Sequence, residues 1–312
     1  MTGLDRRVFL ATGAAALSSP AIAAIDAREG FARVPGGKVW WRTVGSSRKT
    51  AILTLHGGPG AGHNYLEPLA ALKNEREVVF YDQLGCGLSD APKDPSLWRI
   101  ERFVREIDAL REALKLDRVI LYGHSWGGWL ALEYMATRGQ GVMGLVLAST
   151  SASLKQYEAG TRRRLKELPN HVGERAAELE AAGRTNSPEY KKIVELFDAT
   201  YLMRLKKPPA FSRASGQNVA KSPTYVTMQG PNEFTVTGNL KDWNRERDLA
   251  RIKIPTLILT SEFDEVTLDC SKTLQAGIAG SKLVIIPGAA HLSMVEKPDV
   301  YVSILRDFLS TV

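Results

Sequence analysis

Residues 118–127 read Arg-Val-Ile-Leu-Tyr-Gly-His-Ser-Trp-Gly, and this stretch decides the fold. Its first half is an apolar run typical of a buried strand, and the apolar residues 128–132 that follow are typical of a helix. Between the two, Gly123-x-Ser125-x-Gly127 marks an abrupt strand-to-helix turn, since small residues are needed on both sides of it. Such a turn exposes the serine hydroxyl, so Ser125 is predicted to be a nucleophile.

A second glycine-rich segment, HGGPG at 56–60, directly follows the apolar run 51–55. When a serine attacks a carbonyl group, the oxygen becomes an anion that needs fixed N–H donors. Glycines let the backbone approach closely, so Gly58 is predicted to supply one amide and Trp126, after the nucleophile, the other. A tight turn after a strand is the alternative interpretation of this segment.

A base and an acid are predicted at the ends of two later strands. The apolar run 254–260 is followed by Asp264, and the run 282–286 is followed by His291. Ligands bind at the carboxyl ends of strands in open parallel sheets. We therefore expect His291 to take the Ser125 proton and Asp264 to hold the imidazole in the right tautomer, with an acyl-enzyme as intermediate.

Other residues compete for the roles of acid and base. The alternative acids are the nearby carboxylates Glu262, Glu265 and Asp269. The remaining histidines are His56, His63, His124 and His171. His124 is expected to point away from the nucleophile and His56 belongs to the glycine-rich loop, while the other two follow no late strand. These positions favour His291 as the base.

Strands and helices alternate along the first half of the chain. The expected strands are 39–44, 51–55, 78–81, 119–122 and 142–148, and the expected helices are 65–73, 101–116 and 126–137. This alternation is typical of a mostly parallel sheet flanked by helices. From about residue 151 apolar positions recur at helical spacing, and the strand–helix rhythm returns only at 254. We expect an α/β core of residues 24–150 and 245–312, with a mainly helical cap, residues 151–244, inserted over the site.

Several longer motifs resemble one known family. They are HGGPG at 56–60, DQLGCGLS at 82–89, GHSWGG at 123–128, GPNEF at 230–234, KDW at 241–243 and FDEVT at 263–267. From about residue 30 onward the chain resembles the proline iminopeptidase (prolyl aminopeptidase) family of α/β-hydrolases. The resemblance implies an α/β-hydrolase fold. It also implies a serine hydrolase that needs no cofactor and releases an N-terminal residue, preferably proline, from short peptides or amides.

Two glutamates are candidates to bind the substrate's amino group. In relatives of this type, glutamates of the NEF and DE segments bind the free α-amino group, and they correspond here to Glu233 and Glu265. An ammonium group taken out of water must meet a carboxylate, or its desolvation is uncompensated. The alternative is that both are solvated loop residues. The aromatic residues Trp126, Phe234 and Trp243 are candidates to line a pocket for a proline ring, although aromatics more often form the core.

Two other functions stay open. The first is hydrolysis of small amino-acid amides or esters, such as prolinamide, by the same triad and the same amine anchors. The second is a non-catalytic binding protein on a hydrolase fold. Such a protein is expected to lack Ser125, Asp264 or His291, and all three are present.

The N-terminal segment predicts export. Arg6-Arg7 is followed by a weakly apolar stretch, residues 11–17, and by Ala21-Ile22-Ala23, a small-x-small cleavage site. The stretch is too short and too interrupted for a stable membrane span. We expect residues 1–23 to be a twin-arginine signal peptide, with the Tat export machinery as a partner and the periplasm as the location. A cytoplasmic location is the alternative.

Composition agrees with an enzyme, because 312 residues with 44% hydrophobic and 24% charged content are ordinary for a globular protein. The formal charge of +7 is modest, and the run 162–164, Arg-Arg-Arg, is interpreted as an exposed helix face and not as a nucleic-acid site. Cys86 and Cys270 are expected to be free thiols. Neither has metal-ligand spacing, so no metal site is expected.

Overall fold

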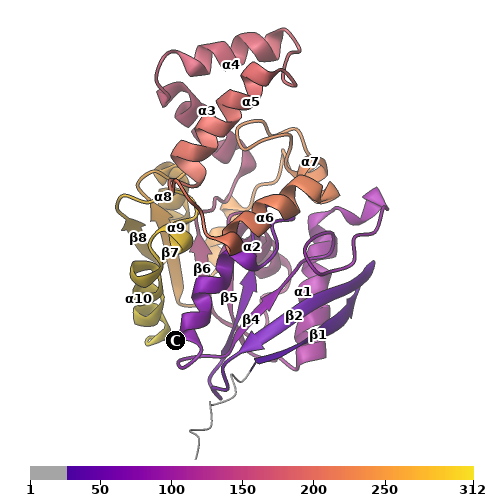
Figure 1. Ribbon diagram of the computed structural model, residues 1–312. Helices are drawn as coiled ribbons and strands as arrows, with labels where there is room; N and C mark the ends of the chain where they lie inside the picture. Colours follow the sequence, from indigo (N-terminus) through magenta and orange to yellow (C-terminus); the bar gives the residue numbers. More distant parts are fainter. Residues whose placement is uncertain (1–26) are drawn as a thin grey trace, which may run out of the picture.

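Strands of one sheet form the centre of the computed structural model, which describes residues 27–312 (Figure 1). The strands are β1 (Ala27–Val34), β2 (Gly37–Val44), β3 (Ala51–Leu55), β4 (Val78–Tyr81), β5 (Val119–His124), β6 (Val142–Ala148), β7 (Thr256–Ser261) and β8 (Lys282–Ile286). Their order in the sheet is β1-β2-β4-β3-β5-β6-β7-β8. The β1–β2 and β2–β4 pairs are antiparallel, and every other pair is parallel. The predicted signal peptide, residues 1–23, lies outside the described residues.

Helices follow most of the strands. The α-helices are α1 (Ile100–Leu114), α2 (Trp126–Thr137), α3 (Leu154–Glu167), α4 (Val172–Ala181), α5 (Pro188–Phe197), α6 (Ala210–Lys221), α7 (Pro223–Met228), α8 (Leu268–Gly277), α9 (Ser293–Glu296) and α10 (Pro298–Leu309). Short 3₁₀ segments are η1 (Asn64–Leu72), η2 (Pro95–Leu97) and η4 (Glu246–Arg251), and η3 (Asp198–Leu202) is a π-helical turn. None of the helices in residues 27–312 is long and apolar enough to cross a membrane.

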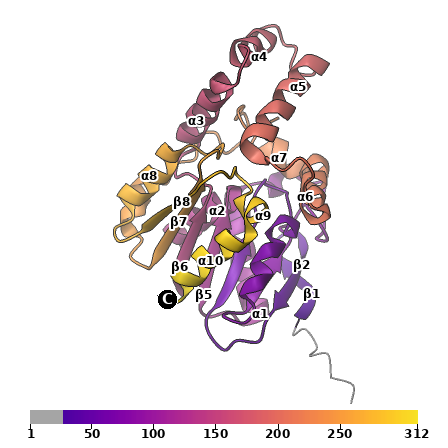
Figure 2. The same cartoon turned by 60° about the vertical axis from the view of Figure 1, so that its left-hand side comes forward.

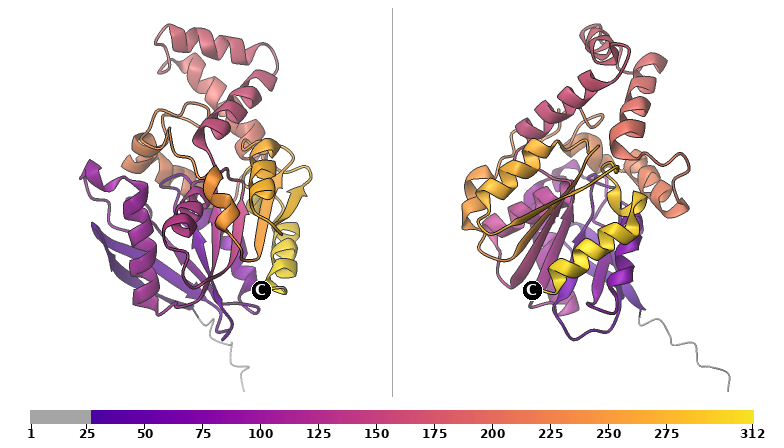
Figure 3. Two further views of the ribbon diagram at one scale, coloured as in Figure 1. Left: turned by 180° about the vertical axis from the view of Figure 1, so that it is seen from behind. Right: turned by 90° about the vertical axis from the view of Figure 1, so that its left-hand side faces the viewer.

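Both faces of the sheet are covered, which explains why its central strands are apolar at every position. In β5 the side chain of Leu121 packs on the face of α1, α2 and α8, whereas Ile120 and Tyr122 pack on the face of η1 and α10. Figures 2 and 3 show these helices on opposite sides of the sheet. The predicted fold class, a mostly parallel sheet flanked by helices, is confirmed.

The structure differs from the sequence-based expectations at two elements. Strand β1 was not expected, because it has no apolar run: only Ala32 and Val34 of its residues are buried. The expected α-helix at 65–73 is instead the 3₁₀ segment η1, which contains Pro68. Proline lacks the N–H that an α-helical hydrogen bond requires.

Helices α3 to α7 lie in sequence between β6 and β7, and in space beyond the carboxyl ends of the strands (Figures 1 and 2). Three of them, α3, α4 and α5, share a hydrophobic cluster with η3 and the segment after α7, built from Leu165, Leu168, Ala176, Leu179, Tyr190, Ile193, Phe197, Tyr201 and Phe234. This cluster holds η3 and the segment after α7, whose residues Asp198 and Glu233 face the end of the sheet.

Candidate active site

Ser125 lies at the sharp turn between β5 and α2. Its φ of 56° and ψ of −124° are unusual for a residue with a side chain. The turn is held on both sides, since the Ser125 N–H donates to the carbonyl of Ala148 at 2.9 Å and the Thr150 hydroxyl donates to the Ser125 carbonyl at 2.9 Å. A Cβ on Gly127 would lie 1.9 Å from the Leu55 carbonyl oxygen, so only glycine fits there.

His291 and Asp264 meet at the neighbouring strand ends. The Nδ1 of His291 donates to Oδ1 of Asp264 at 2.8 Å, and the two side chains are 3% and 0% exposed. The same carboxylate accepts the N–H of Val266 at 3.0 Å and the hydroxyl of Thr260 at 3.4 Å. These contacts orient the imidazole so that Nε2 is left for another partner.

The other candidate acids do not contact Nδ1 of His291. Glu262 is exposed and accepts the N–H of Gly288 at 2.8 Å, and the exposed Asp269 pairs with Arg163 at 2.6 Å. Glu265 is 1% exposed, and its Oε1 lies 3.5 Å from Nε2 of His291. Of the four carboxylates, Asp264 is the one placed to hold the imidazole.

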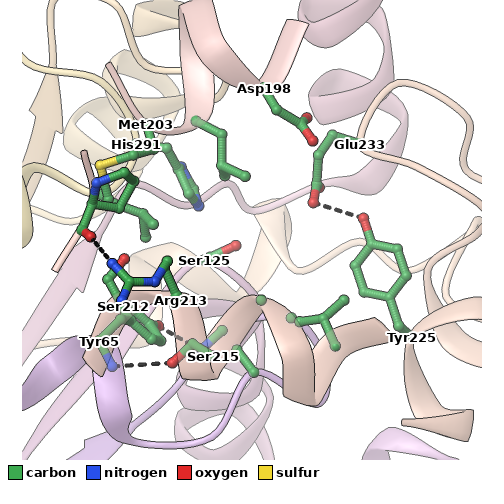
Figure 4. A pocket seen from close by; sticks show the side chains of 18 of the residues that line it. Tyr65, Ser125, Asp198, Met203, Ser212, Arg213, Ser215, Tyr225, Glu233 and His291 are labelled. Carbon is green, nitrogen blue, oxygen red and sulfur yellow. Dashed lines mark hydrogen bonds between the residues drawn. The ribbon is translucent and has the colours of Figure 1, made fainter. Parts of the chain in front are cut away.

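Ser125 and His291 line one cavity of about 410 Å³ between the sheet end and the helices above it. Figure 4 shows the serine hydroxyl and the imidazole on the same side of this cavity. Within residues 27–312, the Ser125 hydroxyl makes no hydrogen bond with a protein group, so it faces the open space.

The loop after β3 borders the cavity at Gly57 and Gly58. Gly58 has a φ of +109°, which favours glycine, and the N–H of Gly57 donates to the Tyr65 hydroxyl at 2.7 Å. The Gly57 amide already has a partner and is therefore not free to bind a substrate oxygen. The pair of oxyanion donors, Gly58 and Trp126, stays a prediction.

Gln83 joins this loop to the nucleophile turn. Its side-chain amide donates to the His56 carbonyl at 3.0 Å, and its Oε1 accepts the indole N–H of Trp126 at 2.7 Å. Its backbone N–H donates to Nε2 of His56 at 3.0 Å. Burial lowers the pKa of His56 to about 4, so this ring is neutral and can accept. Gln83 of the DQ segment thus links the loop after β3 to the turn that carries Ser125 and does not itself line the cavity.

His124 does not point away from the site, contrary to expectation. Its ring centroid lies 4.6 Å from that of His291, and its Nε2 donates to the His291 carbonyl at 3.1 Å. Its Nδ1 therefore accepts the Tyr65 hydroxyl, at 2.9 Å. Burial holds the pKa of His124 well below its usual range. The neutral ring of His124 therefore holds the backbone carbonyl of His291 through this hydrogen bond.

Glu233 enters the cavity from the segment after α7. Its carboxylate accepts the hydroxyls of Tyr157 at 2.8 Å and Tyr225 at 2.6 Å. Burial, with the charge of Glu233, raises the pKa of both tyrosines well above the usual range, so both hydroxyls remain donors. Burial first, and then the charge of Glu233, also raises the pKa of Glu265 well above its usual range.

The three aromatic residues that were candidates for a proline-ring pocket, Trp126, Phe234 and Trp243, belong to the core and do not line the cavity. Phe234 is 0% exposed and packs against Phe197, with ring centroids 5.0 Å apart. Trp243 packs on the main core, and its indole N–H donates to Glu133 at 2.9 Å. The indole of Trp126 is also fully buried.

The arginine run 162–164 is not one exposed face. Arg162 pairs with Glu180 at 2.8 Å, and Arg164 donates to the carbonyls of Asp264 and Glu262 at 3.1 Å each. The run therefore ties α3 to its neighbours, including the loop of the acid.

One group of potential metal ligands lies in the described residues: His56, Asp82 and Cys86. Asp82 is already bonded to Nδ1 of His63 at 2.8 Å and to the N–H of Leu88 at 2.9 Å. Nε2 of His56 accepts the Gln83 N–H. These groups are thus used in hydrogen bonds within the protein. Cys86 and Cys270 are free, buried thiols.

Sequence reasoning missed one acidic side chain of the cavity, Asp198. It begins η3, directly after α5, and Figure 4 shows its carboxylate directed toward Glu233. Because it sits at the end of an amphipathic helix among other charged residues, no local pattern separates it from a solvated surface acid.

Comparisons with known proteins show the family of the chain. Residues 50–298 match the alpha/beta hydrolase fold family. A proline iminopeptidase of Saccharolobus solfataricus is 38% identical over 293 residues, which cover 92% of this chain and 94% of the relative. The crystal structure of VinJ aligns with a TM-score of 0.86 at 32% identity, over 91% of this chain and 98% of that one. A proline iminopeptidase structure from Mycobacterium smegmatis aligns with a TM-score of 0.85 at 29% identity, with the same coverage.

Proposed function

The chain belongs to the proline iminopeptidase family of α/β-hydrolases, and from this premise we propose that it is a serine aminopeptidase that releases N-terminal proline from short peptides or amides. The observation that carries the proposal is the half-buried carboxylate of Glu233, held by two tyrosines in the same cavity as Ser125. A carboxylate fixed at that place suits a substrate whose cationic end is close to the bond that is cleaved.

In the proposed reaction, Ser125 Oγ attacks the carbonyl carbon of the N-terminal residue, and Nε2 of His291 takes the hydroxyl proton. The oxygen becomes an anion that the N–H groups of Gly58 and Trp126 stabilise. The C–N bond then breaks, and His291 gives its proton to the leaving amine. Water hydrolyses the acyl-enzyme by the same route. Asp264 stabilises the imidazolium at each stage.

Selectivity for a free amino terminus follows from the charge of the cavity. The proposed ligands of the substrate's ammonium group are Glu233, which lines the cavity, and Glu265, which is buried beside His291. A substrate with a blocked amino group would leave these carboxylates without a cation, and an unpaired buried charge is unfavourable. A cavity of about 410 Å³, lined on one side by residues of α5, α6 and α7, suits a small substrate. We propose that residues 151–244 act as the cap that enforces this limit.

The test is a panel of aminoacyl-naphthylamides together with their N-acetylated counterparts, assayed on the wild type and on Ser125→Ala. We expect prolyl-naphthylamide to be the best substrate, the blocked compounds to be poor and the alanine variant to be inert. Adding prolinamide, Pro-Gly and longer prolyl peptides separates a peptidase from a prolinamide-type amidase. Equal rates on free and blocked substrates would refute the aminopeptidase proposal.

We also propose export through the twin-arginine signal of residues 1–23, which lies outside the described residues. The support is the Arg6-Arg7 pair and the Ala21-Ile22-Ala23 site. Cell fractionation of the wild type and of a variant with both arginines replaced by lysine tests it. The wild type should be periplasmic and the variant cytoplasmic, whereas cytoplasmic wild type would contradict the proposal.

A further inference from the structure

Asp198 occupies the acidic side of the cavity without a structural task of its own. It lines the cavity together with Glu233 and Tyr225. In Figure 4 its carboxylate points toward that of Glu233, across the cavity from Ser212 and Arg213 of α6. Its backbone carbonyl accepts the N–H of Met203 at 2.9 Å, but its side chain makes no hydrogen bond within residues 27–312.

The carboxylates of Asp198, Glu233 and Glu265 form no ion pair with a lysine or arginine in residues 27–312. In the described chain, the basic group within ion-pair distance of Asp198, Glu233 or Glu265 is His291, whose Nε2 is 3.5 Å from Glu265. Oε2 of Glu265 is buried and has no hydrogen-bond partner within residues 27–312. A buried carboxylate oxygen with no partner, beside two further carboxylates, indicates a place for a cation from outside.

We propose that Asp198 is a specificity-determining residue of the amino-group subsite, a third carboxylate that strengthens binding of the substrate's ammonium group when ionised and loses that effect when protonated. The inference rests on the proposed function, because it assumes that Glu233 and Glu265 face the substrate's amine. It adds a residue from η3, far in sequence from both glutamates.

The titratable groups whose charges act together with that of Asp198 are acidic or neutral. They are Glu195 from α5, Glu233 from the segment after α7, Glu265 from the loop after β7 and the hydroxyl of Tyr225 from α7. The cation that lines the same cavity, Arg213 of α6, lies on the opposite side. Burial, with the negative charges of Glu233 and Glu195, raises the pKa of Asp198 to about 7. A bound ammonium would favour the ionised form. Affinity for the amine should therefore increase as the pH rises through neutrality, until the amine itself loses its proton.

The first test is steady-state kinetics on prolyl-4-nitroanilide at about pH 5.5 and about pH 7.5 for the wild type, Asp198→Asn and Glu189→Gln. We expect the wild-type KM to fall by about fivefold across this range and the KM of Asp198→Asn to change by less than about twofold, with similar kcat. Glu189→Gln removes an exposed carboxylate of α5 that pairs with Arg175 and does not act on Asp198, so it should behave like the wild type. A loss of kcat at both pH values with an unchanged KM would indicate a merely structural role and overturn the inference.

The second test reads binding without turnover. Calorimetry measures the Kd of L-prolinamide for Ser125→Ala and for the Ser125→Ala, Asp198→Asn double variant at the same two pH values. Tighter binding at about pH 7.5 than at about pH 5.5, lost in the double variant, supports the inference. An equal pH dependence in both proteins, or no binding by either, refutes it. If the wild type binds prolinamide in this way but does not cleave prolyl-nitroanilide, the proposed function fails while the inference about Asp198 stands.

Discussion

Replacing Glu233 by glutamine removes one charge from the cavity with little change of shape. The carboxylate accepts one tyrosine hydroxyl at each oxygen, from Tyr157 at 2.8 Å and from Tyr225 at 2.6 Å. A glutamine keeps one carbonyl oxygen as an acceptor, and its NH₂ group can donate to the other tyrosine oxygen. The variant therefore tests the charge and not the packing.

Loss of one partner of a desolvated charge pair costs on the order of 2 to 5 kcal/mol. Glu233 is half-buried, so we expect the lower end of this range. Glu233→Gln should thus lower kcat/KM on prolyl-4-nitroanilide by roughly 30- to 100-fold. Hydrolysis of 4-nitrophenyl acetate, which has no amine, should change by less than about threefold, because Ser125, His291 and Asp264 are untouched.

The assay compares kcat/KM for the two substrates in the wild type, Glu233→Gln and Glu262→Gln. Glu262 supplies the matched control, since it is an exposed glutamate near the acid loop whose side chain accepts only a backbone N–H, from Gly288 at 2.8 Å. The control should leave both activities unchanged. Equal losses on the amide and the ester in Glu233→Gln would show that the residue supports the whole site and does not anchor an amine.

Three further outcomes are expected. The pKa of Glu265 is raised in the folded protein, so the stability that this group contributes is present below its unfolded pKa and is lost as the pH rises. Glu265→Gln should therefore raise the Tm by a few degrees at pH 8 and by less at pH 5, while it lowers prolyl amidase activity. An unchanged Tm at pH 8 would contradict this expectation. His63, beside Asp82, has its pKa raised to about 9, so the wild type should lose on the order of 3 kcal/mol of unfolding free energy between pH 6.5 and pH 9, as measured by urea denaturation. His63→Gln should lack this slope. A Cβ at Gly127 would lie 1.9 Å from the Leu55 carbonyl oxygen, so Gly127→Ala should unfold the protein or destabilise it by more than about 3 kcal/mol. Nothing lies within 4 Å of a Cβ at Gly216, so Gly216→Ala should stabilise helix α6 slightly. Thermal melts of the two variants measure both effects.

Local sequence patterns were sufficient for the centre of the sheet. The runs 51–55 and 78–81 coincide with β3 and β4 to the residue, and 142–148 with β6, because strands buried on both faces are apolar throughout. Where that condition fails, prediction fails too. Strand β1 is an edge strand with mostly exposed side chains, and its place depends on the backbone pairs it makes with β2.

For the site, the sequence by itself determined which chemical groups stand at strand ends: Ser125 after β5, Asp264 after β7 and His291 after β8. The tertiary structure alone decided their partners. It brought Asp198 beside Glu233 and placed Glu265 3.5 Å from His291. The physical reason is that hydrophobic periodicity along the chain records which face of an element is buried. The meeting of two charges, and the pKa values that result, depend on burial and on segments distant in sequence.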